Sequence, residues 1–325
     1  MASFLADYGL FLAKTATIVI ALLVISAGVA SALQRRHRPD RIEVTKLNDD
    51  IEHAQDVLRS QTLPKKEWKR LAKERRRQHK REAKTGVPGR KRMYVLDFHG
   101  DIKATAVAAL REEVTAVLTI ATAQDEVLVR LENAGGLVHE HGLAASQLAR
   151  LRERGIPLTA AVDKIAASGG YMMACVADKI VAAPFAVLGS IGVLAQLPNF
   201  HDMLARQGIR FEQESAGEHK RNVTMFGVNT EKEREKLREE LEETHRLFKQ
   251  FVARYRPGLD IERLATGEHW YGSRALELKL ADVLKTSDDY LLEAATTTDL
   301  FYVACTPRQG LVDRLFAALH TRLRL

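Results

Sequence analysis

The sequence AASGGY at residues 166–171 is the stretch around which the rest of the chain is organised. It follows IPLTAAV (156–162), a short apolar run bounded by proline that is typical of a buried strand. It precedes MMACVA (172–177), whose small apolar residues predict a buried helix. Ser168 is therefore expected on a strand-to-helix turn between small residues.

Two interpretations of Ser168 fit this position. As a nucleophile it would be exposed on the turn, where glycines let a substrate backbone approach and helix N–H groups stabilise a developing oxyanion. As a structural residue it would cap the helix, because serine is a favoured N-cap. The stretch alone leaves both open.

The composition indicates a folded globular protein with extra charge. The chain has 325 residues, 46% of them hydrophobic and 28% charged, with a net charge of +7. Such a length fits one large domain or two ordinary ones of roughly 100–200 residues. About eleven excess positive charges lie between residues 34 and 92, so the basicity belongs to one segment. Cys175 and Cys305 are too few for a disulfide framework.

An N-terminal membrane anchor is predicted over residues 1–34. Residues 15–33 are uncharged and apolar, close to the roughly 20 residues that a membrane-spanning helix needs. The alternative is a cleaved signal peptide, because the sequence ASA at 30–32 resembles a cleavage site. The region before the apolar core is long and poorly basic for a signal peptide, which favours the anchor. Positive charges after the anchor place the C-terminal body in the cytoplasm.

A basic helical stalk and linker are predicted over residues 35–92. The pattern from 41 to 84 is helical and becomes strongly basic, and TGVPG (85–89) reads as a linker. A basic run is also found in nucleic-acid-binding proteins, but no aromatic-interleaved base-reading motif accompanies this one. We therefore expect no nucleic acid and a solvated stalk that rests on anionic lipid.

A single α/β domain is predicted over residues 93–305, because strands alternate with helices as in a mostly parallel sheet covered on both faces. The tail at 306–325 is predicted to be an amphipathic helix with Leu311, Leu315 and Leu319 on one face, suited to a partner groove or a membrane surface. The expected strands are 93–98, 126–131, 156–162, 179–184, 187–193, 209–214 and 300–304, and the expected helices are 104–121, 143–154, 172–177, 199–207 and 230–253.

A nucleophilic serine needs a base, and the spacing does not identify one. The candidate histidines are His139, His141, His219 and His269, and the chain has no G-x-S-x-G motif. A lysine serves instead only where desolvation or a neighbouring cation lowers its pKa. Lys220 follows the predicted strand 209–214, but by position alone it is one of many lysines.

Several motifs in order resemble the signal peptide peptidase A family of serine peptidases, most closely its SohB-type branch. They are AGG (134–136), DKIAASGGYMMACVADKIVAAP (163–184), GSIGV (189–193), GEHKR (217–221) and GEHWYG (267–272). The resemblance implies a Clp protease/crotonase-like α/β fold and a Ser-Lys dyad without cofactor or metal. It assigns Ser168 as nucleophile, Lys220 as general base, Gly136 with Gly169 to the oxyanion site, and Ser190 as a hydrogen-bonding support for the lysine.

One departure concerns the loop before the oxyanion glycines. The family usually has Ser-Pro-Gly-Gly where this chain has NAGG (133–136), which removes the rigid proline and keeps both glycines. We expect activity to survive this change, with less preorganisation of the loop.

The expected function is a membrane-anchored serine endopeptidase that cleaves peptides such as signal-peptide remnants or membrane-protein fragments. The resemblance also implies a homo-oligomeric ring in the bacterial inner membrane, with Ser168 and Lys220 meeting across a boundary between copies. Related peptidases are commonly placed outside the cytoplasmic membrane, against the charge rule, so the side stays open. The alternatives are a crotonase-like acyl-CoA enzyme and a non-catalytic membrane scaffold.

Overall fold

The structure is a computed structural model that describes residues 8–21, 41–85, 90–217, 220 and 223–306. These fall into two compact units, Met1–Glu43 with Cys305–Leu325, and Val44–Ala304. In the first unit, residues 8–21 are helical. No helix within the described residues is both long and apolar enough to cross a membrane. Most of the predicted anchor, and residues 307–325 of the C-terminal helix predicted at 306–325, lie outside the described residues.

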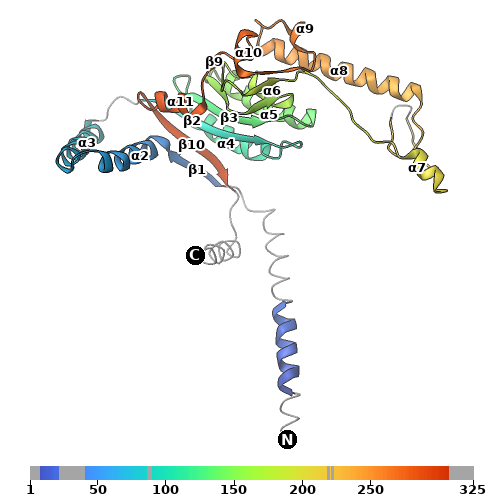
Figure 1. Cartoon of the computed structure of the whole chain (residues 1–325), viewed down its shortest axis with the longest axis horizontal. Coiled ribbons are helices and arrows are strands. Elements are labelled where there is room, and N and C mark those ends of the chain that lie inside the picture. Colours follow the sequence, from blue (N-terminus) through green and yellow to red (C-terminus); the bar gives the residue numbers. More distant parts are fainter. Residues whose placement is uncertain (1–7, 22–40, 86–89, 218–219, 221–222, 307–325) are drawn as a thin grey trace. The chain divides into compact units, whose positions relative to one another are not determined.

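The second unit is built on a ten-stranded, mostly parallel sheet (Figure 1). Its main path runs β1-β10-β2-β3-β4-β6-β9, while β5 pairs with β3 and β7, and β7 pairs antiparallel with β8. The α/β class and the parallel sheet are confirmed. The strands are β1 (Arg41–Lys46), β2 (Lys91–Gly100), β3 (Glu126–Asn133), β4 (Leu158–Val162), β5 (Ile165–Ala167), β6 (Lys179–Ala182), β7 (Val187–Gly189), β8 (His269–Tyr271), β9 (Val283–Leu284) and β10 (Thr298–Thr306).

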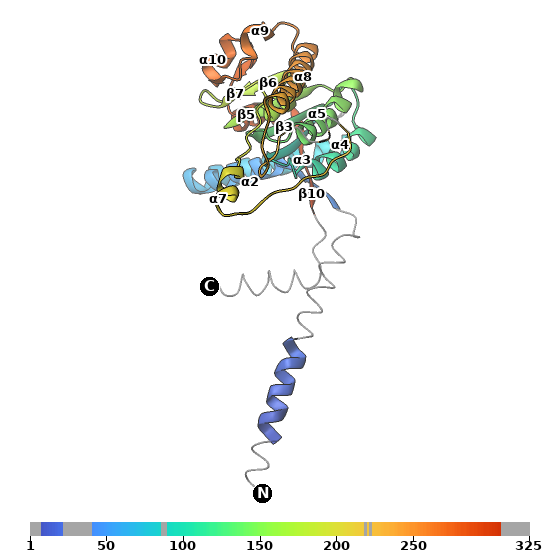
Figure 2. The same ribbon diagram turned by 90° about the vertical axis from the view of Figure 1, so that its right-hand side faces the viewer.

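Helices α4 (Val107–Ile120), α5 (Val138–Glu153) and α6 (Gly169–Ala174) pack together on one face of this sheet (Figures 1 and 2). Successive residues of a strand point to opposite faces, so alternate positions of β2, β3 and β4 supply the core beneath the helices. These side chains are almost fully buried: Leu96, Phe98, Val127, Val129, Leu131, Leu158 and Ala160.

The other face is apolar at one end of the strands and charged at the other. At the apolar end, β2 and β3 contribute a cluster that packs against α2 (Leu47–Thr62) and α11 (Ser287–Ala294). Buried Asn48 ties α2 to β10, because its Oδ1 accepts the Leu300 N–H at 2.7 Å and its Nδ2 donates to the Thr298 carbonyl at 3.0 Å. The cluster consists of Met93, Val95, Leu128, Ala161, Leu291 and Leu300, with Leu47, Ile51 and Tyr290 packed on it.

The stalk and one predicted strand differ from expectation. Residues 41–46 form β1 rather than helix, and the helical region divides into α2 and α3 (Lys65–Thr85) at Pro64. Proline disfavours helical geometry in the residue before it, and Leu63 is extended with ψ 151°. The strand predicted at 209–214 is wrong: these residues alternate in polarity but pair with no strand in the described part of the chain. Residues 86–89 of the predicted linker lie outside the described residues.

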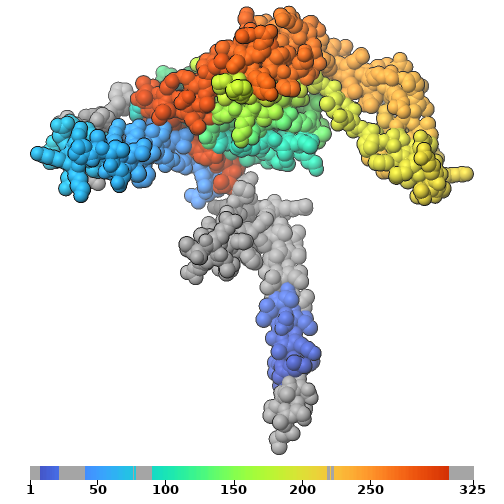
Figure 3. Space-filling model, viewed as in Figure 1, coloured from blue at the N-terminus to red at the C-terminus, as the bar shows by residue number. Residues whose placement is uncertain are grey.

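An arm of residues 193–230 connects β7 to the long helix α8 (Glu231–Tyr255) and carries the short helix α7 (His201–Arg206). Helix α8 starts at a capping box, in which Thr230 and Glu233 exchange hydrogen bonds. Its buried residues, Phe248 and Val252, both belong to its C-terminal half. In Figures 1 and 3 the arm and the N-terminal end of α8 accordingly project away from the sheet. The remaining short helices are α9 (Ile261–Leu264) and α10 (Gly272–Glu277).

Candidate active site

Ser168 occupies a strained turn between β5 and α6. Its φ of 53° and ψ of −118° are unusual for a residue with a side chain. The Ser168 N–H donates to the Gly189 carbonyl at 2.8 Å, and the Ser168 carbonyl accepts the Met172 N–H at 2.9 Å, so hydrogen bonds hold the turn on both sides. The side chain sits at the N-cap position but makes no capping hydrogen bond. The interpretation of Ser168 as a helix cap therefore fails.

A glycine loop at residues 134–137 passes against Ser168. A Cβ added to Gly135 would lie 2.7 Å from the Ser168 Cβ, and the φ of Gly135 is +89°, a conformation that favours glycine. A Cβ added to Gly136 would lie 2.2 Å from the Ile102 carbonyl oxygen. Both glycines of the NAGG sequence are therefore required by close backbone packing, one against Ser168 and the other against the loop after β2.

Asn133 and His141 lie beneath this loop and are both almost fully buried, at 1% and 0% exposure. Asn133 Oδ1 accepts the Gly135 N–H at 2.9 Å and lies 3.1 Å from His141 Nε2. His141 Nδ1 lies 3.0 Å from the Leu137 carbonyl oxygen. No sequence motif assigned a role to Asn133. One signal was available, because Asn133 continues the odd-numbered, helix-facing side of β3.

The candidate histidines do not provide a base for Ser168. Both ring nitrogens of His141 are directed at hydrogen-bond acceptors other than Ser168, although the ring itself packs on Gly169. His139 is exposed and lies 3.7 Å from Glu140, and His269 is exposed on β8. His219 lies outside the described residues. The geometry of the described histidines thus offers no Ser-His pair.

Ser190 is placed next to the Ser168 turn by strand pairing. It follows β7, whose Gly189 is in register with Ala167 of β5. Its φ is 52°, and its N–H donates to the Glu268 carbonyl at 2.6 Å. The predicted support residue therefore lies on the strand end adjacent to Ser168.

Lys220 is not brought to Ser168 within one chain. It lies in the arm and is exposed, and its N–H donates to the Gly217 carbonyl at 3.2 Å. No hydrogen bond joins these two described residues. The arm instead folds on itself: Phe200 donates its N–H to the Met225 carbonyl, and the Phe211 and Phe226 rings lie 5.7 Å apart.

Three further residues near the turn make structural contacts. Asp163 accepts the Ser287 N–H at 2.8 Å at the start of α11. Lys164 pairs with Glu132 at 2.9 Å. The buried Tyr171 hydroxyl donates to the Leu280 carbonyl at 3.2 Å, and burial raises the pKa of Tyr171 well above its ordinary value. These contacts fix the two ends of the strand-to-helix segment.

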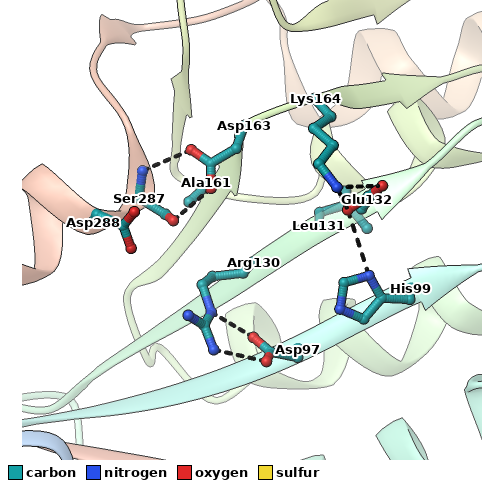
Figure 4. Close-up of a pocket in the computed structure, with 10 residues that line it drawn as sticks. All are labelled: Asp97, His99, Arg130, Leu131, Glu132, Ala161, Asp163, Lys164, Ser287 and Asp288. Atoms are coloured by element: carbon teal, nitrogen blue, oxygen red, sulfur yellow. Dashed lines mark hydrogen bonds and ion pairs between the residues drawn. The ribbon is translucent and has the colours of Figure 1, made fainter.

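A polar pocket of about 280 Å³ lies at the charged end of the opposite sheet face (Figure 4). Two ion pairs line it, Arg130 with Asp97 at 2.5 Å and Lys164 with Glu132 at 2.9 Å, and His99 Nδ1 lies 3.7 Å from Glu132. Asp288 also lines the pocket, and neither of these two ion pairs includes it. Nor does any cluster of three or more His, Cys, Asp or Glu within the described ranges have the arrangement of a metal site.

Comparisons with known proteins agree over nearly the whole chain. Residues 3–148 match the N-terminal part of peptidase family S49, and residues 150–300 match peptidase family S49 itself. The chain is 45% identical over 322 residues to the probable protease SohB of Haemophilus influenzae, covering 95% of this chain and 91% of that protein. It is 53% identical over 230 residues to the probable protease SohB of Buchnera aphidicola subsp. Acyrthosiphon pisum, covering 71% of this chain and 68% of that protein.

Among solved structures, a mutant of the 1510-N membrane-bound stomatin-specific protease in complex with a substrate peptide aligns with 13% identity and a TM-score of 0.44, over 71% of this chain and 98% of that chain. The sequence relatives are far closer, and they decide the assignment. The chain therefore belongs to peptidase family S49, the signal peptide peptidase A family, in its SohB branch, and is a serine-type peptidase.

Proposed function

We propose that this protein is a membrane-anchored serine endopeptidase in which Ser168 is the nucleophile and Lys220 the general base. The observation that carries the proposal is the strained turn at Ser168, whose hydroxyl does not cap α6 and whose Cβ lies against the glycine loop. Backbone strain of this kind clusters at active sites, where the surrounding structure holds a reactive group in place.

In the proposed mechanism, the Ser168 hydroxyl attacks the carbonyl carbon of a peptide bond while the neutral Lys220 amine removes its proton. The Gly136 N–H stabilises the oxyanion of the tetrahedral intermediate. The protonated Lys220 then donates to the leaving amine, which gives an acyl-enzyme. Water, activated by the same lysine, releases the acid product and restores Ser168.

Lys220 is exposed in the single chain, whereas a lysine base needs a desolvated environment. We therefore propose that assembly into a homo-oligomeric ring brings Lys220 of one copy to Ser168 of its neighbour. The arm supports this proposal because it exposes large apolar side chains that a second copy would cover. They are Leu194, Leu197, Met203, Ile209, Phe211, Phe226 and Val228.

The proposed anchor is the apolar sequence at 15–33, and the proposed substrates are signal-peptide remnants or membrane-protein fragments released in the same membrane. The basic residues after the anchor favour a cytoplasmic catalytic domain. Protease treatment of intact spheroplasts tests the side: a protected domain supports the cytoplasm, and a digested one places it outside.

The test of the proposed chemistry is covalent labelling with a fluorophosphonate probe. Wild type is compared with Ser168→Ala and Lys220→Ala, each checked for unchanged folding and assembly. Loss of labelling in both variants supports the dyad. Labelling that persists in Ser168→Ala removes the nucleophile. An unlabelled wild type that binds acyl-CoA would favour the crotonase-like alternative.

A further inference from the structure

We propose that Asn133 and His141 form a positioning pair that sets the glycine loop 134–137 against Ser168. The proposal rests on the proposed peptidase function and extends it to residues that touch neither substrate nor reacting atoms. Two contacts carry it: the hydrogen bond that Asn133 Oδ1 accepts from the loop, and the packing of the His141 ring on the residue after Ser168.

Asn133 fixes the start of the loop from the end of β3. Its Oδ1 accepts the Gly135 N–H, which can only donate, and this bond sets the orientation of the amide group. Its Nδ2 then faces Met173 Sδ of α6 at 3.4 Å. The side chain fills the space beside Gly100, where an added Cβ would lie 2.4 Å from Asn133 Cγ. The amide therefore has one packed position, and it holds Gly135 with it.

His141 fixes the end of the loop from the first turn of α5. Its ring Nδ1 and its backbone N–H are both directed at the Leu137 carbonyl, at 3.0 and 3.1 Å. That oxygen can only accept, so Nδ1 donates to it. Nε2 faces Asn133 Oδ1 at 3.1 Å. One buried ring thus links Asn133, where the loop begins, to Leu137, where it ends.

The same ring also touches the Ser168 turn. A Cβ added to Gly169 would lie 2.4 Å from His141 Cγ, so the ring packs directly against the Gly169 backbone. Asn133 approaches the next residue, because a Cβ on Gly170 would lie 2.1 Å from the Asn133 carbonyl oxygen. The pair therefore sets the distance between the glycine loop and the nucleophile turn through direct contacts with both.

This arrangement determines which glycine N–H is available for catalysis. The Gly135 N–H is committed to Asn133, so of the two loop glycines only Gly136 can offer its N–H to an oxyanion. An oxyanion donor is effective only when it already points at the developing charge. Because the chain has alanine at 134 in place of a rigid proline, the side-chain pair supplies the constraint that the loop backbone lacks.

The experiment uses the full-length protein and three variants. His141→Leu removes both ring nitrogens, whereas His141→Gln keeps an amide that can donate toward Asn133 Oδ1. Gln147→Leu is the matched control, because Gln147 lies on the same helix, is 8% exposed, and bonds to Arg150 rather than to the loop. Hydrogen exchange of peptides that cover residues 133–141 is measured first, and the kinetics of peptide cleavage second.

We expect His141→Leu to accelerate exchange in the 133–141 peptides about tenfold or more, with α4 unchanged. We expect its kcat to fall roughly 10–100-fold while KM stays near the wild-type value, because a displaced oxyanion donor acts on the transition state. His141→Gln should recover part of both effects, and Gln147→Leu should show neither.

If the loop of His141→Leu exchanges hydrogen at the wild-type rate, the proposal is overturned. Faster exchange that also spreads over α4 and β2 overturns it as well, because His141 would then only stabilise the domain as a whole. Should His141→Leu not fold, Asn133→Ala is compared with Asn133→Asp, which keeps the acceptor for Gly135. Equal loop exchange in these two variants overturns it. Hydrogen exchange of the loop can be measured without enzyme activity. It therefore tests the positioning pair even if the probe does not label the wild-type protein and the peptidase proposal fails.

Discussion

Ser168 and Ser190 follow the ends of two neighbouring parallel strands, and both have a positive φ, of 53° and 52°. Their strands β5 and β7 pair in register, and the Ser168 N–H donates to the Gly189 carbonyl at 2.8 Å. Each residue of this kind costs about 1–3 kcal/mol and persists only where the surrounding structure over-determines it. Two of the four non-glycine residues with a positive φ in the described part of the chain therefore lie on adjacent strand ends, and one of these two is the proposed nucleophile.

Replacing Ser168 by glycine should separate the effect of backbone strain on stability from the effect of losing the hydroxyl on activity. Ser168→Gly and Ser168→Ala both remove the hydroxyl and should both abolish labelling by the fluorophosphonate probe. Glycine adopts the observed φ and ψ without a Cβ clash, so its variant should be about 1 kcal/mol more stable to unfolding than the alanine variant. Urea unfolding of the two variants measures this difference. Equal midpoints would show that the turn is not strained.

Gly135 should tolerate no side chain because it lies against Ser168, in addition to having a positive φ. In Gly135→Ala the new methyl group would lie 2.7 Å from Ser168 Cβ, so the loop or the turn must move, and we expect about a 100-fold loss of kcat/KM. The matched control is Gly155→Ala, because Gly155 also has a positive φ, of +68°, but has open space around it. That variant should lose some stability and keep its activity. Equal activities in the two variants would contradict the proposed contact.

The sheet was predictable from sequence because its central strands are apolar and alternate with helical segments. Strands β2, β3 and β4 lie close to their expected ranges. The failures come from segments whose partners are remote in sequence. Residues 41–46 become β1 beside β10 at the far end of the chain, and residues 209–214 alternate in polarity without any strand to pair with.

The candidate site likewise has a part that local sequence predicts and a part that it does not. The Ser168 turn was readable because a strand, small residues and a helix follow one another locally. The Asn133–His141 contact joins the end of a strand to a helix across a loop, and no local pattern reports it. The position of Lys220 depends on the arm, whose exposed apolar residues are typical of a surface completed by another chain. The catalytic and supporting roles assigned to the site stay predictions, namely those of Ser168, Lys220, Gly136, Gly169 and Ser190.

Acid should destabilise the domain in part through Glu126 at the start of β3. Burial raises the pKa of this carboxyl, but hydrogen bonds from Lys91 at 2.9 Å and Thr159 at 2.8 Å outweigh burial and hold it below its ordinary value. A pKa that is lower in the folded state gives stability that is fully present above the unfolded value, about 4.3, and is lost as pH falls through the folded value.

Glu126→Gln should therefore lower stability at pH 7 and flatten its decline below about pH 5. Urea unfolding between pH 3 and 7 measures both effects. Glu239→Gln is the control, because Glu239 forms an exposed ion pair with Lys236 on α8, and such pairs contribute little. A Glu126→Gln profile parallel to wild type would contradict the role assigned to this carboxylate.

Mixing two inactive variants should restore activity if the dyad forms between copies. Ser168→Ala supplies an intact Lys220, and Lys220→Ala supplies an intact Ser168. In randomly mixed rings with equal amounts of each, about a quarter of the boundaries would join an intact Ser168 to an intact Lys220. Probe labelling and peptide cleavage after co-expression should therefore reach roughly that fraction of wild type. A dyad formed within one chain predicts no recovery, because each copy would lack one of its two groups. Lys220 is exposed on the arm, and no hydrogen bond joins it to Ser168 within the described part of the chain, which is the reason to expect recovery.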